Sequence, residues 1–435
     1  MIISCLTEIL LLTILNNLFL KNYLIFSSSV NAFTFIFLPF WLILSYIFGR
    51  YSYNEDLYKN RNLILFFKLF IRTVIIANLS IIFVLMLSIN INLNNYNHFD
   101  KVILIYTSYL SLVVNIIQIP IIKQFIKNAQ KEDLWIFFGT KSLFYLLKKE
   151  LNLSRKKLKI LYYSDKLQSK LLSLKNIKGL LVSDIKNYEN SKFRFIFELR
   201  NSNIKIYNIE KWCENYLQRL PCEFLTITYL TNSFTNYSMQ MRLKRVGDIV
   251  LSIILFVILF PILLFSSVLI YLEDKHGFIY KQERVGKNQK IFTLYKLRTM
   301  KYNSEKGKPQ WSRKFDSRIT KVGKFLRKTR LDELPQLINV IIGDMSLIGP
   351  RPEREIFDIE LSKHIPQYNS RYLIKPGLSG WAQVNFPYGS SVEDSKKKFS
   401  YDIYYLKNFS IWLDFLILLK TIKIIFLKKG SEPIR

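Results

Sequence analysis

Apolar residues dominate the first 125 positions of the chain and fall into four long runs. The runs cover residues 3–20, 31–48, 70–89 and 102–122. A helix that crosses a bilayer needs about 20 mostly apolar residues, so the pattern predicts a four-helix transmembrane bundle over residues 1–125. For the first run a cleaved signal peptide is the alternative, although no small-residue cleavage site follows Leu20. Lysines and arginines between the second and third runs and after the fourth place both ends of the bundle in the cytoplasm.

Beyond residue 130 the pattern changes to short apolar runs separated by polar helical stretches. The short runs are residues 134–138, 158–163, 179–182, 193–197 and 204–209. This alternation predicts a small Rossmann-like α/β domain over residues 131–235. The turn after the first run holds one glycine, Gly139, where a dinucleotide fingerprint needs three. We therefore expect a Rossmann-like fold that binds no dinucleotide.

Two further apolar stretches lie in the second half of the chain. Residues 249–271 are long enough for a fifth span, but Pro261 stands at the midpoint and predicts a kink or a break. Both flanks are basic, so a crossing would export one of them against the positive-inside rule. These features favour a re-entrant helix that enters and leaves by the same face. Residues 411–429 combine lysines with a large apolar face, which fits either an amphipathic helix in the membrane interface or a buried core helix.

Composition excludes several classes of protein. The 435 residues include 63 Lys and Arg against 32 Asp and Glu, a net charge of +31, yet half of all residues are hydrophobic. Apolar membrane segments combined with basic cytosolic parts explain both figures. Three scattered cysteines and three scattered histidines argue against a disulfide scaffold and a structural zinc site. The charge alone would allow a nucleic-acid binder, but the spans and the lack of a matching motif argue against nucleic acid as a partner.

Most glycines and prolines lie beyond residue 240, where we expect the chemistry, and there two carboxylates are adjacent. Asp332 and Glu333 follow Arg327 and Arg330 and precede Pro335, which is tolerated in the first turn of a helix. At a helix N-terminus, Asp and Glu are ordinary caps. The neighbouring cations support a second interpretation, a site for a phosphoryl substrate. An aspartate can accept a phosphoryl group covalently, and a carboxylate pair can hold Mg²⁺ against a diphosphate.

Three more cations are candidates for the same site. Arg351 lies between Pro350 and Pro352 in a rigid turn, and a guanidinium binds phosphate bidentately. Lys296 and Arg298 alternate along a predicted strand and share one face. A plain surface turn and a solvated strand face are the alternatives for these positions.

Residues 242–430 resemble the bacterial sugar transferases, which are monotopic polyprenyl-phosphate phosphoglycosyl transferases. The resemblance rests on the proline-interrupted membrane helix and on the motifs at residues 244–248, 282–286, 295–300, 327–337, 343–352, 375–384 and 401–408. The four predicted spans and the α/β segment resemble the long form that initiates exopolysaccharide or O-antigen repeat units. Two departures stand out. Gly277 is followed by Phe278 where members commonly have proline, and the Asn-Gly-Arg that often follows Val384 is absent.

The resemblance implies an enzyme of the bacterial inner membrane whose mainly helical α/β catalytic domain lies on the cytoplasmic face. It would transfer sugar-1-phosphate from a nucleotide diphosphate sugar, such as a UDP-hexose, to polyprenyl phosphate and release a nucleoside monophosphate. By the matching motif, Asp332 would be the nucleophile, and Glu333 would help to hold Mg²⁺ with it. The remaining residues implied for the phosphates and the substrate are Arg327, Arg351, Lys296, Arg298 and Asp402.

The same resemblance implies that Lys244 and Arg245 face the lipid phosphate at the membrane interface. The sequence leaves open whether the protein forms a homo-oligomer. Two other functions compete with this one: an ordinary glycosyltransferase that cleaves the sugar C–O bond, and an inactive scaffold for polysaccharide export. Release of a nucleoside diphosphate would identify the first, and full function without Asp332 would identify the second.

Overall fold

The computed structural model describes residues 40–48, 69–80, 82, 133–152, 158–163, 177–183, 204–226, 229, 238–304, 316–386, 389 and 391–426. The chain divides into two compact units, Met1–Lys131 and Glu132–Arg435. In the first unit, residues 40–47 and Leu69–Ser80 are helical and fall within the second and third predicted spans. The first and fourth predicted spans lie outside the described residues. The four-helix bundle therefore stays a prediction.

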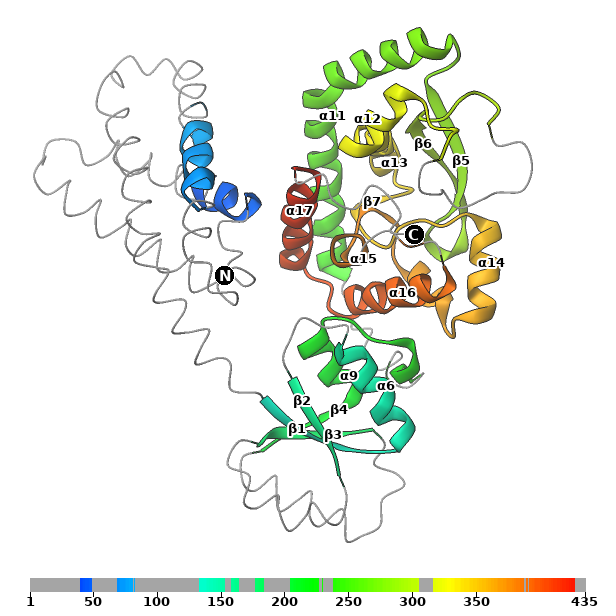
Figure 1. Cartoon of the computed structure of the whole chain (residues 1–435). Coiled ribbons are helices and arrows are strands. Elements are labelled where there is room, and N and C mark those ends of the chain that lie inside the picture. Colours follow the sequence, from blue (N-terminus) through cyan, green and yellow to red (C-terminus); the bar gives the residue numbers. More distant parts are fainter. Residues whose placement is uncertain are drawn as a thin grey trace, which may run out of the picture. The chain divides into compact units, whose positions relative to one another are not determined.

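The second unit begins with a four-stranded parallel sheet (Figure 1). Its strands are β1 (Asp133–Phe138), β2 (Leu158–Tyr162), β3 (Ile177–Val182) and β4 (Lys205–Asn208), in the order β2-β1-β3-β4, and helix α6 (Lys141–Asn152) follows β1. Four of the five short apolar runs form these strands, and the run at 193–197 lies outside the described residues. Both faces of β1 are covered, because Trp135 and Phe137 lie in one hydrophobic core and Ile136 and Phe138 in another. Burial on both faces explains the unbroken apolar runs.

The sheet domain and the domain after residue 238 share a hydrophobic core. The segment after β4 forms α9 (Ile209–Trp212) and a π-helix, Cys213–Leu217, and it packs on α14 (Glu355–His364) and α16 (Val392–Lys407). Two contacts fix this packing: the Leu220 N–H donates to the Ser400 carbonyl at 2.8 Å, and Lys407 pairs with Glu214 at 2.9 Å. Within the second unit, the two domains therefore form one continuous core.

The apolar run around Pro261 forms α11 (Ser238–Asp274), a single 37-residue helix with the proline inside it. The expected break does not occur, although the ribbon changes direction part-way along (Figure 1). Among the described residues, α11 is the one helix that is long and apolar enough to cross a membrane by length and composition. Much of its middle is exposed, with Val257, Ile258 and Phe265 more than 60 % accessible. An apolar surface of this size marks a membrane or partner contact.

The remaining elements form a helical domain with short strands. They are the antiparallel pair β5 (Ile279–Val285) and β6 (Ile291–Leu297), the parallel pair β7 (Ser346–Ile348) and β8 (Gly377–Ser379), α12 (Lys321–Thr329), α13 (Gln336–Ile342), α15 (Trp381–Asn385), α17 (Ile411–Phe426) and three 3₁₀ turns at Lys287–Gln289, Leu331–Glu333 and Tyr368–Leu373. Buried Asn339 of α13 is bonded to β6 twice: it accepts from the Tyr295 N–H at 3.1 Å and donates to the Thr293 carbonyl at 2.7 Å. These bonds fix the strand that carries Lys296 against the helix that follows the carboxylate pair.

Helix α17 packs Leu413, Ile417 and Leu419 against the domain, where its polar groups also make contacts, and leaves other large apolar groups exposed. Asp414 pairs with Lys244, and Lys420 lies over the Trp381 ring and donates to Asn385 at 2.9 Å. Trp412 and Phe426 are more than 60 % exposed. This arrangement matches an interfacial helix better than a buried core helix.

Candidate active site

Asp332 and Glu333 occupy a short 3₁₀ turn between α12 and α13. Arg330 ends α12 in the left-handed region at φ 60°, which reverses the chain, and Pro335 precedes the first residue of α13. The carboxylates therefore stand just before a helix start, as the sequence predicts. Both residues are only 9 % exposed, so they are not solvated surface caps.

Three cations surround Glu333. Its carboxylate lies 3.3 Å from Lys296 Nζ and 3.1 Å from an Arg351 nitrogen, and Arg330 approaches to 3.7 Å. Burial by itself would raise the pKa of Glu333, but Lys296, Arg351 and Arg330 outweigh it and hold the pKa below its usual range. Glu333 is therefore an ionised anchor that gathers two of the predicted phosphate-binding cations.

Asp332 has a different environment from its neighbour. Its Oδ1 is buried and has no hydrogen-bond partner among the residues that the structure describes. Burial, followed by the charge of Glu333, raises the pKa of Asp332 to about 6. Burial also lowers the pKa of Lys296 to about 8. Two adjacent carboxylates with pKa values pushed apart are typical of a catalytic pair.

The pair opens into a cavity of about 640 Å³. Lys296, Arg298, Arg327 and Arg351 all line it, so the structure brings together four of the five predicted substrate contacts with the carboxylates. Eleven Lys and Arg side chains line the cavity against three carboxylates, which favours a polyanionic ligand.

Neighbouring contacts position two of these cations. Arg327 Nε donates to Thr299 Oγ1 at 2.8 Å, and Arg298 lies 3.4 Å from Asp274. Gly323 allows α12 to pack this closely, since a Cβ there would lie 2.1 Å from the Thr299 carbonyl oxygen. Sequence reasoning missed the cavity cations Arg284, Arg318 and Arg354. Arg284 belongs to the motif at residues 282–286, and this motif was the one feature of the sequence that could have indicated its place in the site.

Asp402, the fifth predicted contact, reaches the cavity only indirectly. It forms a buried ion pair with Arg371 at 3.1 Å, and each side chain is 4 % exposed. The same Arg371 nitrogen donates to the Arg351 carbonyl at 2.7 Å. Asp402 thus acts through Arg371 on the backbone of the turn that carries Arg351.

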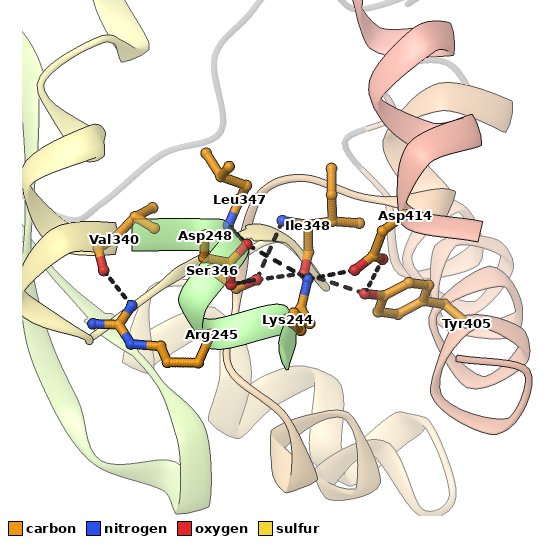
Figure 2. Close-up of polar contacts among 9 residues, drawn as sticks. All are labelled: Lys244, Arg245, Asp248, Val340, Ser346, Leu347, Ile348, Tyr405 and Asp414. Atoms are coloured by element: carbon orange, nitrogen blue, oxygen red, sulfur yellow. Dashed lines mark hydrogen bonds and ion pairs between the residues drawn. The ribbon is translucent and has the colours of Figure 1, made fainter. Parts of the chain in front are cut away.

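Lys244 and Arg245 both have partners inside the protein (Figure 2). Lys244 lies 2.6 Å from Asp414 and 3.8 Å from Asp248, and Arg245 donates to the carbonyls of Val340 and Ile341 at the end of α13. Partners distant in sequence thus hold both side chains and join α11 to the catalytic domain, while a contact with the lipid phosphate stays a prediction.

Asp248 completes this junction. Its carboxylate accepts from Ser346 Oγ at 2.7 Å and from the Leu347 N–H at 3.3 Å, both on β7. Asp414 in turn accepts from the Tyr405 hydroxyl at 2.6 Å. Figure 2 shows that these side chains converge from α11, β7, α16 and α17. The start of α11 is therefore fixed to the domain by polar contacts.

Comparison with known proteins agrees with this geometry. Residues 239–428 match the model of the family described as "Bacterial sugar transferase". A UDP-glucose:undecaprenyl-phosphate glucose-1-phosphate transferase of Caulobacter vibrioides is 39 % identical over 181 residues, which cover 41 % of this chain and 68 % of that protein. The chain belongs to the bacterial sugar transferase family.

The names of two more relatives specify other sugars. A UDP-N-acetylgalactosamine-undecaprenyl-phosphate N-acetylgalactosaminephosphotransferase of Aeromonas hydrophila is 40 % identical over 239 residues, 55 % of this chain and 56 % of that protein. An undecaprenyl-phosphate galactose phosphotransferase of Salmonella typhimurium is 38 % identical over 206 residues, 43 % of this chain and 41 % of that protein. The matched region thus spans about half the length of these two relatives.

Proposed function

We propose that this chain transfers sugar-1-phosphate from a nucleotide diphosphate sugar to undecaprenyl phosphate and releases a nucleoside monophosphate. The observation that carries the proposal is the buried Asp332–Glu333 pair at the edge of a cation-lined cavity. Small-molecule sites commonly measure about 300–1,000 Å³, and this cavity of about 640 Å³ can hold a nucleotide sugar. The cavity cations can neutralise a diphosphate.

In the proposed reaction Asp332 is the nucleophile. A carboxylate oxygen attacks the sugar-bearing phosphorus, the P–O bond to the nucleoside monophosphate breaks, and a phosphosugar-aspartyl intermediate forms. An oxygen of the lipid phosphate then attacks the same phosphorus and releases Asp332. Two observations support this role: Oδ1 makes no hydrogen bond with the described residues, and with a pKa of about 6 the carboxylate is mostly ionised near pH 7.

Mg²⁺ fits the pair only together with a substrate. Among the described residues, no cluster of three or more His, Cys, Asp or Glu side chains could hold a metal. Mg²⁺ is commonly held by one or two carboxylates together with substrate phosphates. Asp332, with its unpartnered oxygen, and Glu333 would hold the ion against a diphosphate, where it would offset charge on the phosphate oxygens.

We also propose that α11 is re-entrant and that the domain lies on one face of the bacterial inner membrane. Near its start, Arg245 donates to the Val340 carbonyl of α13 at 2.6 Å; near its end, Glu273 accepts from the Val322 N–H of α12 at 3.2 Å. Helices α12 and α13 are joined by the short turn that holds Asp332, so a bilayer of about 30 Å cannot separate them. This supports a helix whose two ends stay on one side.

The relatives' names support the class of donor. All three name undecaprenyl phosphate and a sugar (glucose, galactose or N-acetylgalactosamine), and two of them name UDP. We therefore propose a UDP-linked hexose or N-acetylhexosamine as donor. From the resemblance to the long form of the family, we also propose a role in initiating an exopolysaccharide or O-antigen repeat unit. The four-span, multi-pass region and a homo-oligomer remain proposals of the same kind.

The test is product analysis with purified protein in detergent, Mg²⁺, undecaprenyl phosphate and a panel of UDP-sugars. The proposal predicts UMP from wild-type protein and none from Asp332→Asn. Lys396→Met is the matched control, because Lys396 forms an ion pair with the exposed Glu393 at 3.7 Å and lines neither the cavity nor the smaller pocket that adjoins it, and it should retain turnover. Release of UDP would instead indicate a glycosyltransferase, and full turnover by Asp332→Asn would remove Asp332 as nucleophile.

A further inference from the structure

A second, smaller pocket adjoins the main cavity. It measures about 60 Å³ and shares Arg330 and Arg351 with the cavity. These are the arginines that contact Glu333. The small pocket therefore begins where the sugar-bearing phosphate of the proposed donor would lie.

The polar part of this pocket is built from buried groups. Its wall holds the Arg371–Asp402 ion pair, in which both side chains are 4 % exposed. Gln383 also lines the pocket; its amide nitrogen donates to the Leu378 carbonyl at 3.3 Å. Among the described residues, neither Gln383 Oε1 nor Arg371 Nε has a hydrogen-bond partner, although both atoms are buried. An unused acceptor and an unused donor thus lie in one small pocket. Buried polar atoms without partners are rare and indicate a missing ligand or water.

The rest of the wall is mixed: Glu353, Lys398, Ser395 and Tyr368 contribute polar groups, and one part of it is apolar. Ala382, Phe386 and Phe399 form the apolar part, and Phe399 is almost completely buried. A volume of about 60 Å³ corresponds to roughly two liquid water molecules, so the pocket holds one small substituent and excludes a second sugar ring. The occupant this pocket favours has an N–H donor, a carbonyl acceptor and a methyl group.

Resting on the proposed function, we propose that this pocket receives the acetamido group on carbon 2 of the donor sugar, and that the donor is a UDP-N-acetylhexosamine. Carbon 2 is bonded to the anomeric carbon that carries the phosphate, so its substituent lies beside the phosphate-binding arginines. The amide N–H would donate to Gln383, the carbonyl would accept from Arg371, and the methyl would contact the apolar part of the wall. A hexose hydroxyl brings neither an amide nor a methyl group to this pocket, and sites built for such hydrogen bonds discriminate strongly.

The experiment compares kcat/KM for UMP release from UDP-GalNAc, UDP-GlcNAc, UDP-glucose and UDP-galactose in separate reactions. We expect the better N-acetylhexosamine donor to exceed the better hexose donor by at least about 100-fold, as for other hydrogen-bonded specificity sites. A wild-type preference for either hexose would overturn the inference and leave the proposed function intact. No UMP from any of the four donors would overturn the proposed function as well.

Two variants test the pocket itself. Ala382→Leu fills it, and Gln383→Met removes the acceptor at similar length; each should lower kcat/KM for the N-acetylhexosamine at least about tenfold more than for the hexoses. Val384→Leu on the same helix adds a methylene outside the pocket, and it should leave the donor preference unchanged. An equal loss for all donors in both pocket variants would show that the pocket has only a structural role.

Discussion

The ion pair between Arg371 and Asp402 offers a quantitative test of how the site is positioned. Arg371→Met would leave the Asp402 carboxylate without the partner that lies 3.1 Å away, at a place where both side chains are 4 % exposed. Breaking a buried ion pair from one side costs about 3–5 kcal/mol, because the remaining charge stays desolvated. The substitution also removes the 2.7 Å bond to the Arg351 carbonyl. We expect both a loss of stability and a lower kcat/KM for the nucleotide sugar.

The pKa of Asp402 determines how the loss of stability in Arg371→Met changes with pH. Burial raises the pKa of Asp402 to about 6 even with Arg371 present. A carboxyl whose pKa is raised in the folded state is most favourable when protonated, so its contribution to stability is lost as the pH rises through about 6. Without Arg371 the pKa rises further, and the penalty at pH 7.5 should exceed the penalty at pH 5.

The assay is thermal unfolding in detergent at the two pH values. Asp402→Asn in the Arg371→Met background should recover much of the lost stability at pH 7.5, because no buried charge remains. Lys396→Met on the same helix breaks the exposed pair with Glu393 and should change stability by no more than about 0.5 kcal/mol. An unchanged melting temperature for Arg371→Met, or no recovery in the double variant, would refute the reasoning.

Three further predictions follow from other contacts. Because burial raises the pKa of Asp332 to about 6, kcat/KM should fall about tenfold per unit below pH 6 as the nucleophile becomes protonated; a flat pH profile down to pH 5 would contradict this. Glu273→Gln weakens the carboxylate that accepts from two backbone N–H groups at the start of α12, and thermal melting should show a loss of about 1 kcal/mol, whereas an unchanged melt would exclude a capping role. Lys407→Met removes the 2.9 Å partner of buried Glu214 between the sheet domain and α16. Thermal unfolding of the variant should therefore begin at least several degrees below that of the wild type. Identical melting curves for the variant and the wild type would show that this contact is not formed in solution.

The parts of the fold that follow local patterns could be predicted from the sequence. The unbroken apolar run 134–138 matches a strand with both faces buried, and Pro335 correctly indicated that Asp332 and Glu333 precede a helix. Lys296 and Arg298 line the same cavity, as the alternation predicted, although β6 ends at Leu297 and Leu297 lines the cavity as well. These inferences need only the period of a strand and the geometry of proline.

Contacts between distant residues could not be predicted in this way. Lys244 pairs with Asp414, which lies 170 positions later, and nothing near Lys244 shows that its charge is neutralised inside the protein. The Arg371 contact to the Arg351 carbonyl and the core shared by the sheet domain and α16 are equally invisible to local patterns. The helix α11 also stays continuous through Pro261, where local rules predict either a kink or a break and do not decide between them.

The central claim is that Asp332 carries the phosphosugar during turnover. The most direct measurement incubates the protein with a UDP-sugar labelled with ³²P at the sugar-bearing phosphorus, without undecaprenyl phosphate, and follows radioactivity on the denatured protein. We expect labelled wild-type protein, no label on Asp332→Asn, and transfer of the label to lipid when undecaprenyl phosphate is added. Label on Asp332→Asn, or UMP release only after lipid is added and with no labelled protein at any time, would contradict the claim.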